Sequence, residues 1–209
     1  MNFLKQITIK HKVILTIILV LIFDQTLKFW IKTNMTMHQE IHIIGNWFII
    51  HFTENRGMAF GWEFGGNIGK MILTVFRIIA VSAICYYLVH LIRKKAPNGL
   101  IISISLILAG ALGNIIDSVF YGVLFGKSTY INVAQFLPEG GGYAKLMLGQ
   151  VVDMLHFPII RTTFPSWFPF KAGEPFVFFS PVFNIADSAI TVGVSILLIF
   201  QRKYFKEFK

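Results

Sequence analysis

Residues 13–31, VILTIILVLIFDQTLKFWI, decide the fold of this chain. The stretch is aliphatic as far as Phe23, and its whole length approaches the roughly 20 apolar residues that a helix needs to cross a bilayer. A secretory signal peptide would be followed by a small-residue cleavage pattern, but this run continues through Asp24 and Lys28 to Trp30. We therefore expect a retained transmembrane helix with polar residues in its outer half.

Three further segments, near residues 71–92, 100–119 and 182–200, have a similar length and apolar character. Across the 209 residues, 55% are hydrophobic and 14% are charged, whereas soluble domains carry about 25% charged residues. This composition excludes a disordered protein, a disulfide-rich scaffold and a soluble globular domain. The predicted fold class is an α-helical integral membrane protein, with four transmembrane helices in a single membrane domain covering residues 1–209.

The distribution of the basic residues, which give the chain a net charge of +9, predicts the orientation in the membrane. Ten of the basic residues flank the apolar stretches in three short clusters: Lys5, Lys10 and Lys12; Arg93, Lys94 and Lys95; Arg202, Lys203, Lys206 and Lys209. Such clusters are typical of the cytoplasmic ends of membrane helices, so we expect both termini in the cytoplasm. The basic residues form no stripe interleaved with exposed aromatic residues, so we expect no nucleic-acid partner.

This orientation places two long segments, about 32–70 and 120–181, outside the cytoplasm. Residues 41–52 mix β-branched and aromatic residues, which favours short strands at the membrane surface. The second segment contains three consecutive glycines at 140–142 and five prolines between Pro158 and Pro181, which favours irregular structure. We therefore expect a small extracytoplasmic β-rich element and an extended outer loop.

Polar side chains gather toward the outer side of the predicted spans. They are Asp24 and Lys28, Asn114 and Asp117, Asn184 and Asp187, and Asp153 in the apolar stretch 151–154. Because a carboxylate at the bilayer centre costs about 2.5–3.5 kcal/mol on insertion scales, we expect these groups to share a partly hydrated cavity near the outer leaflet.

Two carboxylates that meet in such a cavity share one proton, because both cannot easily ionise at low dielectric. Such a pair can activate water and protonate a leaving amine, as in aspartic peptidases. The chemistry of the residues does not choose which two of the four Asp residues form the pair.

A small transporter or channel for a cation or proton is an alternative function, since intramembrane carboxylates alone fit it equally well. A transporter needs polar side chains along its inner path, and the inner halves of three spans contain only Thr16, Ser103, Ser105 and Ser195. These residues make a poor conduit. An inactive membrane scaffold with the same fold is a third alternative that only an assay excludes.

Metal or thiol chemistry has little support in the local sequence. Cys85 stands alone in an apolar run, and the spacing of a motif such as H-E-x-x-H is missing from three histidines of the first outer segment: His38, His42 and His51. We therefore expect neither a metal nor a cofactor. We interpret His156 as an interfacial histidine, and Arg77 as a side chain that snorkels to the outer interface or contacts lipid phosphate or substrate.

Five short motifs resemble, in chain order, those of the lipoprotein signal peptidases, the type II signal peptidases of bacterial membranes. They are Asp24-Gln-Thr-Leu-Lys28, Asn55-Arg-Gly57-Met-Ala59-Phe60, Gly113-Asn114-Ile-Ile-Asp117, Val151-Val152-Asp153 and Phe183-Asn184-Ile-Ala186-Asp187. The resemblance covers essentially the whole chain. It implies a metal-free intramembrane aspartyl endopeptidase that cuts prolipoproteins just before a cysteine already carrying diacylglycerol.

The resemblance also implies residue roles. Asp153 and Asp187 would form the catalytic dyad; Asn114, Asp117 and Asn184 would shape the site; Asn55 and Gly57 would hold the substrate peptide; Asp24 and Lys28 would be conformational supports. The implied partners are the prolipoprotein and membrane lipids. The protein would be a monomer in the bacterial inner membrane, with its active site toward the extracytoplasmic side.

Two features depart from the family pattern. Ser118 follows Asp117 where the family usually has Arg, so a charge contact near the site is either missing or supplied by another residue, with Arg56 and Lys127 as the candidates. Residues 118–150 also form a longer connection than the family needs, which predicts an additional loop on the outer face.

Overall fold

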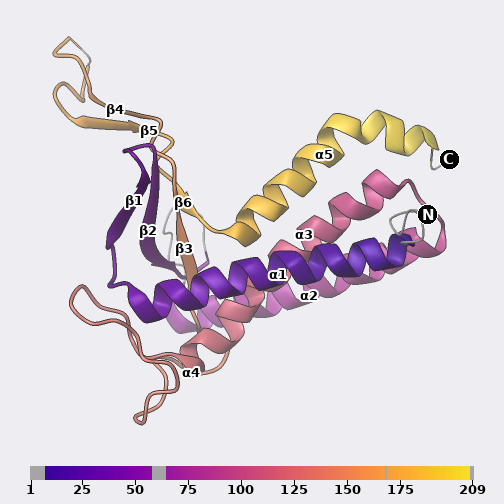
Figure 1. The fold of residues 1–209 in the computed structure, drawn as a ribbon, viewed down its shortest axis with the longest axis horizontal. Helices are drawn as coiled ribbons and strands as arrows, with labels where there is room; N and C mark the ends of the chain where they lie inside the picture. Colours follow the sequence, from indigo (N-terminus) through magenta and orange to yellow (C-terminus); the bar gives the residue numbers. More distant parts are fainter. Residues whose placement is uncertain (1–7, 58–64, 168, 208–209) are drawn as a thin grey trace, which may run out of the picture.

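The computed structural model describes residues 8–57, 65–167 and 169–207, and places a bundle of long helices beside a β-sheet at one end (Figure 1). Within the described residues, four helical stretches are long and apolar enough to cross a membrane. They comprise α1 (Ile9–Asn34), α2 (Gly66–Arg93), α3 (Asn98–Ile116) with its continuation to Leu124, and α5 (Ile185–Glu207). The fold is that of a mostly helical membrane protein.

The helices differ from the expected spans mainly at the fourth. The stretches 13–31, 71–92 and 100–119 fall inside α1, α2 and the run from α3 to Leu124. The stretch 182–200 was expected to be helical throughout, but Val182–Phe183 form a short strand, β6, and α5 begins at Ile185. A continuous apolar run does not distinguish the end of a strand from the first turn of a helix, and here pairing with a neighbouring strand decides the outcome.

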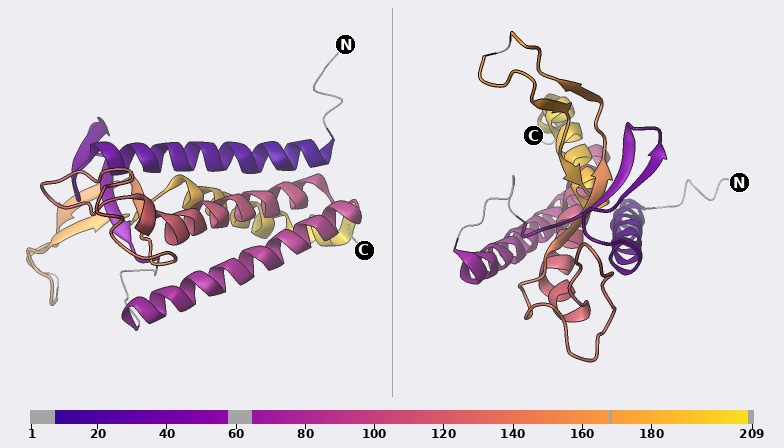
Figure 2. Two further views of the ribbon diagram at one scale, coloured as in Figure 1. Left: turned by 90° about the horizontal axis from the view of Figure 1, so that it is seen from below. Right: turned by 90° about the vertical axis from the view of Figure 1, so that its left-hand side faces the viewer.

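Close approach of α3 to α5 depends on small residues at their contact. A Cβ atom on Gly110 would lie 2.2 Å from the carbonyl oxygen of Ala186, and one on Gly193 would lie 2.7 Å from the carbonyl oxygen of Ser103. Packing of this kind lets membrane helices approach through their backbones. Helix α2 packs less closely along its length, since its N-terminal end diverges from α1 and α3 (Figure 2).

The outer end of α3 changes its winding at the polar residues. The π-helical turn η3 (Asp117–Tyr121) follows α3 directly and leads into the short α4 (Gly122–Leu124). Asp117 and Ser118, at the start of this turn, are fully buried. Single π-turns inside helices are frequent at functional sites, because they change the direction in which side chains point.

A four-stranded antiparallel sheet lies at the outer end of the bundle, in the order β1-β2-β3-β6. Its other strands are β1 (Glu40–Ile44), β2 (Phe48–Asn55) and β3 (Val151–His156). A separate hairpin pairs β4 (Ile160–Thr163) with β5 (Pro175–Phe178). Much of the segment 120–181 is irregular, as expected, but it also contains the three strands β3, β4 and β5. Partners on both sides of β3 satisfy its backbone groups, and its burial removes the polar alternation that marks a half-exposed strand.

The segment 118–150 is attached to the helices and to the sheet. Lys32 of α1 forms a buried ion pair with Glu54 of β2, and its ammonium group also donates to the hydroxyl of Ser128 at 2.9 Å. Phe125 and Ala134 belong to a core cluster that also contains residues of α1, β2 and β3. These contacts fix the segment against the outer end of α1.

Candidate active site

The first turn of α5 contains a reciprocal cap built from two of the predicted site residues. The Oδ1 atom of Asn184 accepts from the backbone N–H of Asp187 at 2.8 Å. The Oδ2 atom of Asp187 accepts from the backbone N–H of Asn184 at 3.4 Å. This is the geometry of a capping box, which satisfies two backbone donors at a helix start. Asn184 and Asp187 therefore cap the start of α5, and this cap fixes the position of the Asp187 carboxylate.

Asn184 also connects Asp187 to Asp153. The side-chain amide of Asn184 donates to Oδ1 of Asp153 at 2.7 Å, and Asp153 lies on β3, beside β6 and close to the start of α5. The remaining oxygen of Asp187 accepts from the side-chain amide of Asn114 at 2.8 Å. The two carboxylates thus lie on either side of one asparagine, although they are 34 positions apart in the sequence.

The register between β2 and β3 brings Asn55 to the same carboxylate. A bulge between Ile50 and Thr53 shifts the pairing, so that Asn55 lies opposite Val151, two residues before Asp153. Steps of two keep side chains on one face of a strand. The side-chain amide of Asn55 accordingly lies 3.4 Å from Oδ2 of Asp153.

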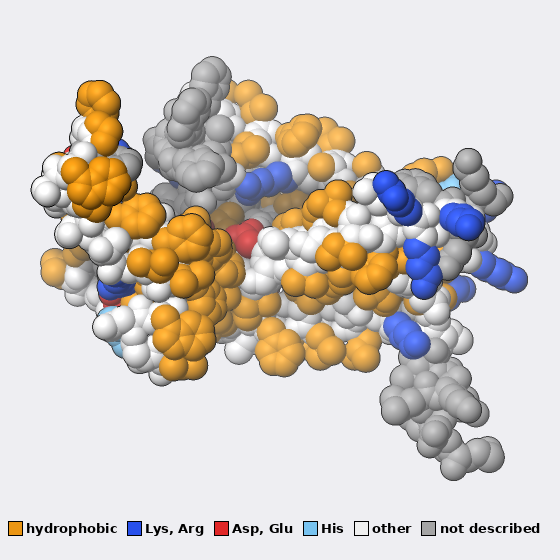
Figure 3. Space-filling model, turned by 90° about the horizontal axis from the view of Figure 1, so that it is seen from above, with side chains coloured by type: hydrophobic (Ala, Val, Ile, Leu, Met, Phe, Trp, Pro, Cys, Tyr) orange, Lys and Arg blue, Asp and Glu red, His pale blue; other side chains and the backbone are white. Residues whose placement is uncertain are grey.

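Asp153 is only 4% exposed, and this burial has an electrostatic consequence. Burial and the nearby carboxylate of Asp187 raise the pKa of Asp153 to about 7, because both disfavour its charged form. Donors from Asn184 and Asn55 oppose the shift without cancelling it. Asp153 therefore holds a proton up to nearly neutral pH. Figure 3 shows an acidic side chain at the surface of a hollow between the sheet end and the helices.

Beneath these groups lies a buried ion network centred on Lys28. Its ammonium group is 2.9 Å from Asp24 and 2.8 Å from Asp117, and all three side chains are fully buried. The same ammonium group donates to Oδ1 of Asn114 at 3.1 Å, which leaves the amide of Asn114 directed at Asp187. Lys28 thus orients Asn114, which in turn contacts Asp187.

The other two members of this network attach the site to the backbone. Asp24 accepts from the backbone N–H of Ala186 in the first turn of α5 at 2.9 Å. Asp117 accepts from the backbone N–H of Val152, next to Asp153, at 3.2 Å. The buried carboxylates therefore fix the two backbone segments that carry Asp153 and Asp187.

Gln25 is a structural member of the site that sequence reasoning missed. Its amide donates to Asp24 at 3.0 Å, to Asp117 at 3.0 Å and to the carbonyl oxygen of Gly113 at 3.2 Å. Its own oxygen accepts from the hydroxyl of Tyr121 at 3.2 Å. Gln25 is a polar residue within a membrane span, and the cost of burying an unpaired amide was the available signal.

The substitution at Ser118 is accompanied by two cations from α2. The Ser118 hydroxyl lies 3.2 Å from the ammonium group of Lys70 and 3.4 Å from the guanidinium group of Arg77. These cations differ from the candidates Arg56 and Lys127. Arg77 also donates to the carbonyl oxygen of Gly57, which lies in the outer segment just after β2. The end of the motif that begins at Asn55, with Ala59 and Phe60, lies outside the described residues.

Comparison with known proteins identifies the family of this chain. A family profile described as "Signal peptidase (SPase) II" matches residues 16–202. The chain belongs to the signal peptidase II family. It is 48% identical to a lipoprotein signal peptidase of Porphyromonas gingivalis over 95% of this chain and 86% of that protein. It is 39% identical to a lipoprotein signal peptidase of Amoebophilus asiaticus over 88% of this chain and 75% of that protein.

Solved structures give the same result for the fold of this signal peptidase II. One bacterial membrane enzyme is 28% identical, with a TM-score of 0.61 over 92% of this chain and 88% of that one. A second is 29% identical, with a TM-score of 0.57 over 90% of both chains. Membership in the family makes the protein a protease of the membrane that removes signal peptides.

Proposed function

We propose that this signal peptidase II is an intramembrane aspartyl endopeptidase in which Asp153 and Asp187 carry the reaction. The observation that supports the proposal is the bridging position of Asn184, which hydrogen-bonds to both carboxylates. Two carboxyl groups held next to each other with different environments can divide the acid and base roles between them.

The environments of the two groups suggest which role each takes. Asp153 is buried and keeps its proton, so it donates that proton to the carbonyl oxygen of the scissile bond. Asp187 is half-buried and accepts hydrogen bonds from the amide of Asn114 and the backbone of Asn184, as an ionised carboxylate does. Asp187 therefore takes a proton from the attacking water as the new C–O bond forms.

Collapse of the tetrahedral intermediate completes the cycle. The C–N bond breaks and the departing amine receives the proton that Asp187 took from water. The proton on the carbonyl oxygen returns to Asp153 as the new carboxylic acid forms. Both carboxyl groups end in their starting protonation states, and the reaction consumes one water molecule for each peptide bond. No metal or cofactor takes part in this proposed cycle.

The proposed substrate is a prolipoprotein, cut just before a cysteine that already carries diacylglycerol. The relatives from Porphyromonas gingivalis and Amoebophilus asiaticus are lipoprotein signal peptidases, which supports this substrate class. Asn55 ends β2 beside Asp153 and Gly57 follows it in the next loop, so the substrate peptide would lie along this part of the chain. The acyl chains would stay among membrane lipids at the side of the bundle, and this double anchoring would position the scissile bond.

We further propose that the protein is a monomer in the bacterial inner membrane. The start of α1, the end of α5 and the turn between α2 and α3 lie at the end of the bundle away from the sheet, where Lys and Arg side chains gather (Figures 1 and 3). The positive-inside rule places this end in the cytoplasm and the site toward the extracytoplasmic side. The transporter alternative loses support at Ser103 and Ser105, whose hydroxyls donate to carbonyls of their own helix.

The test uses purified full-length protein with a diacylated prolipoprotein, and identifies the new amino terminus by mass spectrometry. The expected product begins with the lipidated cysteine. Asp153→Asn and Asp187→Asn should each abolish cleavage while the protein remains folded and inserted in the membrane. Glu139→Gln removes a carboxylate in the outer segment and should cleave normally. Turnover near that of the wild type in either Asp variant would remove the proposed dyad, and a cut elsewhere would remove the proposed substrate.

A further inference from the structure

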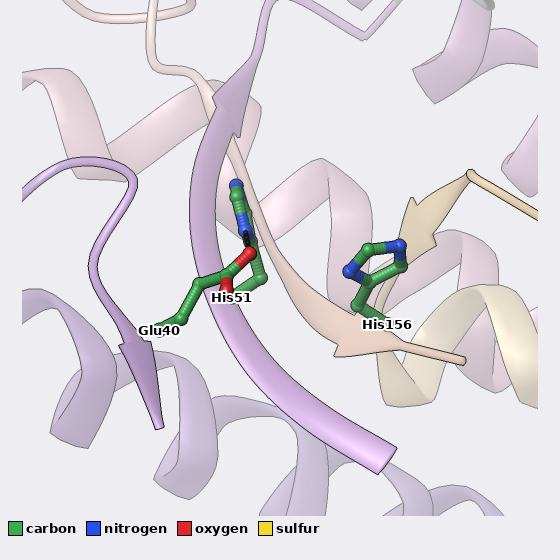
Figure 4. A group of neighbouring side chains, drawn as sticks. All are labelled: Glu40, His51 and His156. Atoms are coloured by element: carbon green, nitrogen blue, oxygen red, sulfur yellow. Dashed lines mark hydrogen bonds and ion pairs between the residues drawn. The ribbon is translucent and has the colours of Figure 1, made fainter. Parts of the chain in front are cut away.

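On the sheet, three side chains with metal-binding atoms come together from three strands. They are Glu40 of β1, His51 of β2 and His156 of β3, and Figure 4 shows their side chains facing one another. One potential ligand atom from each residue lies within 4.8 Å of those of the other two. Imidazole nitrogens with a carboxylate oxygen are a ligand set that zinc and other late first-row divalent ions prefer.

The register of the sheet creates this group. Glu40 and His51 are direct partners across β1 and β2, whereas His156 pairs with Ile49, two residues from His51. A step of two along a strand returns to the same face, so the three side chains project from one face of the sheet. The rings of His51 and His156 are 5.8 Å apart between centroids.

A second observation points to a ligand for His156. This side chain is 9% exposed, and neither of its ring nitrogens has a hydrogen-bond partner among the described residues. A buried polar group without a partner costs about 1–3 kcal/mol, so such groups call for an explanation. One of the two nitrogens faces the Glu40 carboxylate and the His51 ring (Figure 4), where a bound cation would satisfy it.

The geometry points to a binding site for one Zn²⁺ ion, which we propose for Glu40, His51 and His156. Zinc bonds of about 2.0–2.2 Å in a tetrahedron need ligand atoms about 3.4 Å apart, so the three side chains must shift by about an ångström. The 2.7 Å hydrogen bond between His51 and Glu40 opens as the ion enters, and Glu40, on the edge strand, has room to move. Water completes the fourth position.

This site is separate from the proposed dyad. His156 and Asp153 are three positions apart on β3, and an odd number of steps along a strand leads to the opposite face. The ion would link β1 to β3 across β2, and would therefore stabilise the strand that carries Asp153. Its role is structural, and binding does not depend on the proposed peptide-bond chemistry.

The experiment measures metal binding by full-length protein in detergent, after removal of any affinity tag and treatment with a chelator. One equivalent of Co²⁺ should give the visible absorption of a tetrahedral ion, and Zn²⁺ should displace it at one ion per chain. Zn²⁺ should also raise the melting temperature, because it binds the folded chain.

Variants then assign the site. His156→Gln should weaken Zn²⁺ binding by at least about tenfold, since even outer-sphere partners of a metal contribute about 10–100-fold. His90→Gln removes a histidine near the far end of α2 and should bind as the wild type does. If His156→Gln does not fold, Glu40→Gln removes a ligand at a side chain that is 34% exposed.

Two results would overturn the proposal. One is a wild-type protein that binds no more Co²⁺ or Zn²⁺ than the triple variant Glu40→Gln, His51→Gln, His156→Gln. The other is a folded His156→Gln or Glu40→Gln variant with the zinc affinity of the wild type. Either would assign His156 to the sheet core without a ligand.

Discussion

The side-chain amide of Asn184 donates to Oδ1 of Asp153 at 2.7 Å, while the side-chain oxygen of the same residue caps α5 at the backbone N–H of Asp187. One residue therefore begins the last membrane helix and links the two carboxyl groups of the site. Helix capping and the proposed catalysis are compatible explanations of the Asn-x-x-Asp spacing, because the two ends of a single amide would serve them separately.

Replacement of Asn184 should separate these two functions. Asn184→Ser keeps a side-chain oxygen for the cap but removes the donor to Asp153, so we expect nearly unchanged stability with a large loss of cleavage rate. Asn184→Ala removes both the capping oxygen and the donor, and should lower the free energy of unfolding by a further ~0.5–2 kcal/mol. Denaturant titration and cleavage assays of both variants check this. Equal stability of the two variants would contradict a capping contribution.

The pH dependence of cleavage should follow the ionisation of Asp153. In the proposed cycle Asp153 acts as an acid, and burial with the neighbouring Asp187 raises its pKa to about 7. The rate should therefore fall as pH rises through about 7, and a pH profile of kcat measures this. An alkaline limb that begins far above this range would assign the acid role to another group.

The pH dependence of the free energy of unfolding provides an independent check on the pH profile of cleavage. At pH values between 3.8, the ordinary pKa of the group, and about 7, Asp153 is protonated in the folded chain and ionised in the unfolded chain. The free energy of unfolding therefore contains a contribution that is full below pH 3.8 and is lost as pH rises through about 7. Asp153→Asn removes this dependence and should be more stable than the wild type at alkaline pH, although inactive.

Gly57 should tolerate no side chain. Its φ is +91°, and a Cβ atom there would lie 2.6 Å from the guanidinium group of Arg77. Gly57→Ala should cost about 1–2 kcal/mol in backbone strain and should displace Arg77, with a marked loss of cleavage. Gly140→Ala is the matched control, because nothing lies within 4 Å of a Cβ atom at Gly140. Unchanged cleavage by Gly57→Ala would show that the loop does not need this conformation.

Lys28→Met should be the most destabilising of these changes. It leaves the buried carboxylates of Asp24 and Asp117 without their cation, and breaking a buried ion pair costs about 3–5 kcal/mol. We expect a lower melting temperature in detergent and less protein in the membrane. Lys171→Met, at an exposed position, should have little effect on either measurement. A stable but inactive Lys28→Met protein would instead indicate a direct part in the reaction.

The membrane helices follow from local composition, which is why the sequence alone predicts them. An apolar run of sufficient length has few other stable environments, so residues 13–31, 71–92 and 100–119 fall within helices regardless of what surrounds them. The start of α5 and the strand β3 could not be predicted in the same way. Val182, Phe183 and Asp153 take their conformation from strand pairing, which depends on distant partners.

For the polar residues of the site, too, the sequence predicted one part and only packing decided the other. The high cost of burying charge indicated that Asp24, Lys28, Asp117 and Asp187 must meet polar partners, and this conclusion needed only the sequence. The partners themselves were set by packing: α2 brings Lys70 and Arg77 to Ser118, although the candidate cations there were Arg56 and Lys127. Spacing along the chain carries no information on which of two remote helices comes closest.

The sequence by itself determined that this protein spans a membrane and keeps several charged groups buried, because burial energies depend on residue type. Only the tertiary structure decided that Asp153 and Asp187 lie on either side of Asn184, and that Glu40, His51 and His156 share one face of a sheet. The physical reason is that both arrangements depend on register and helix packing, which join residues far apart in the chain through contacts that no local pattern records.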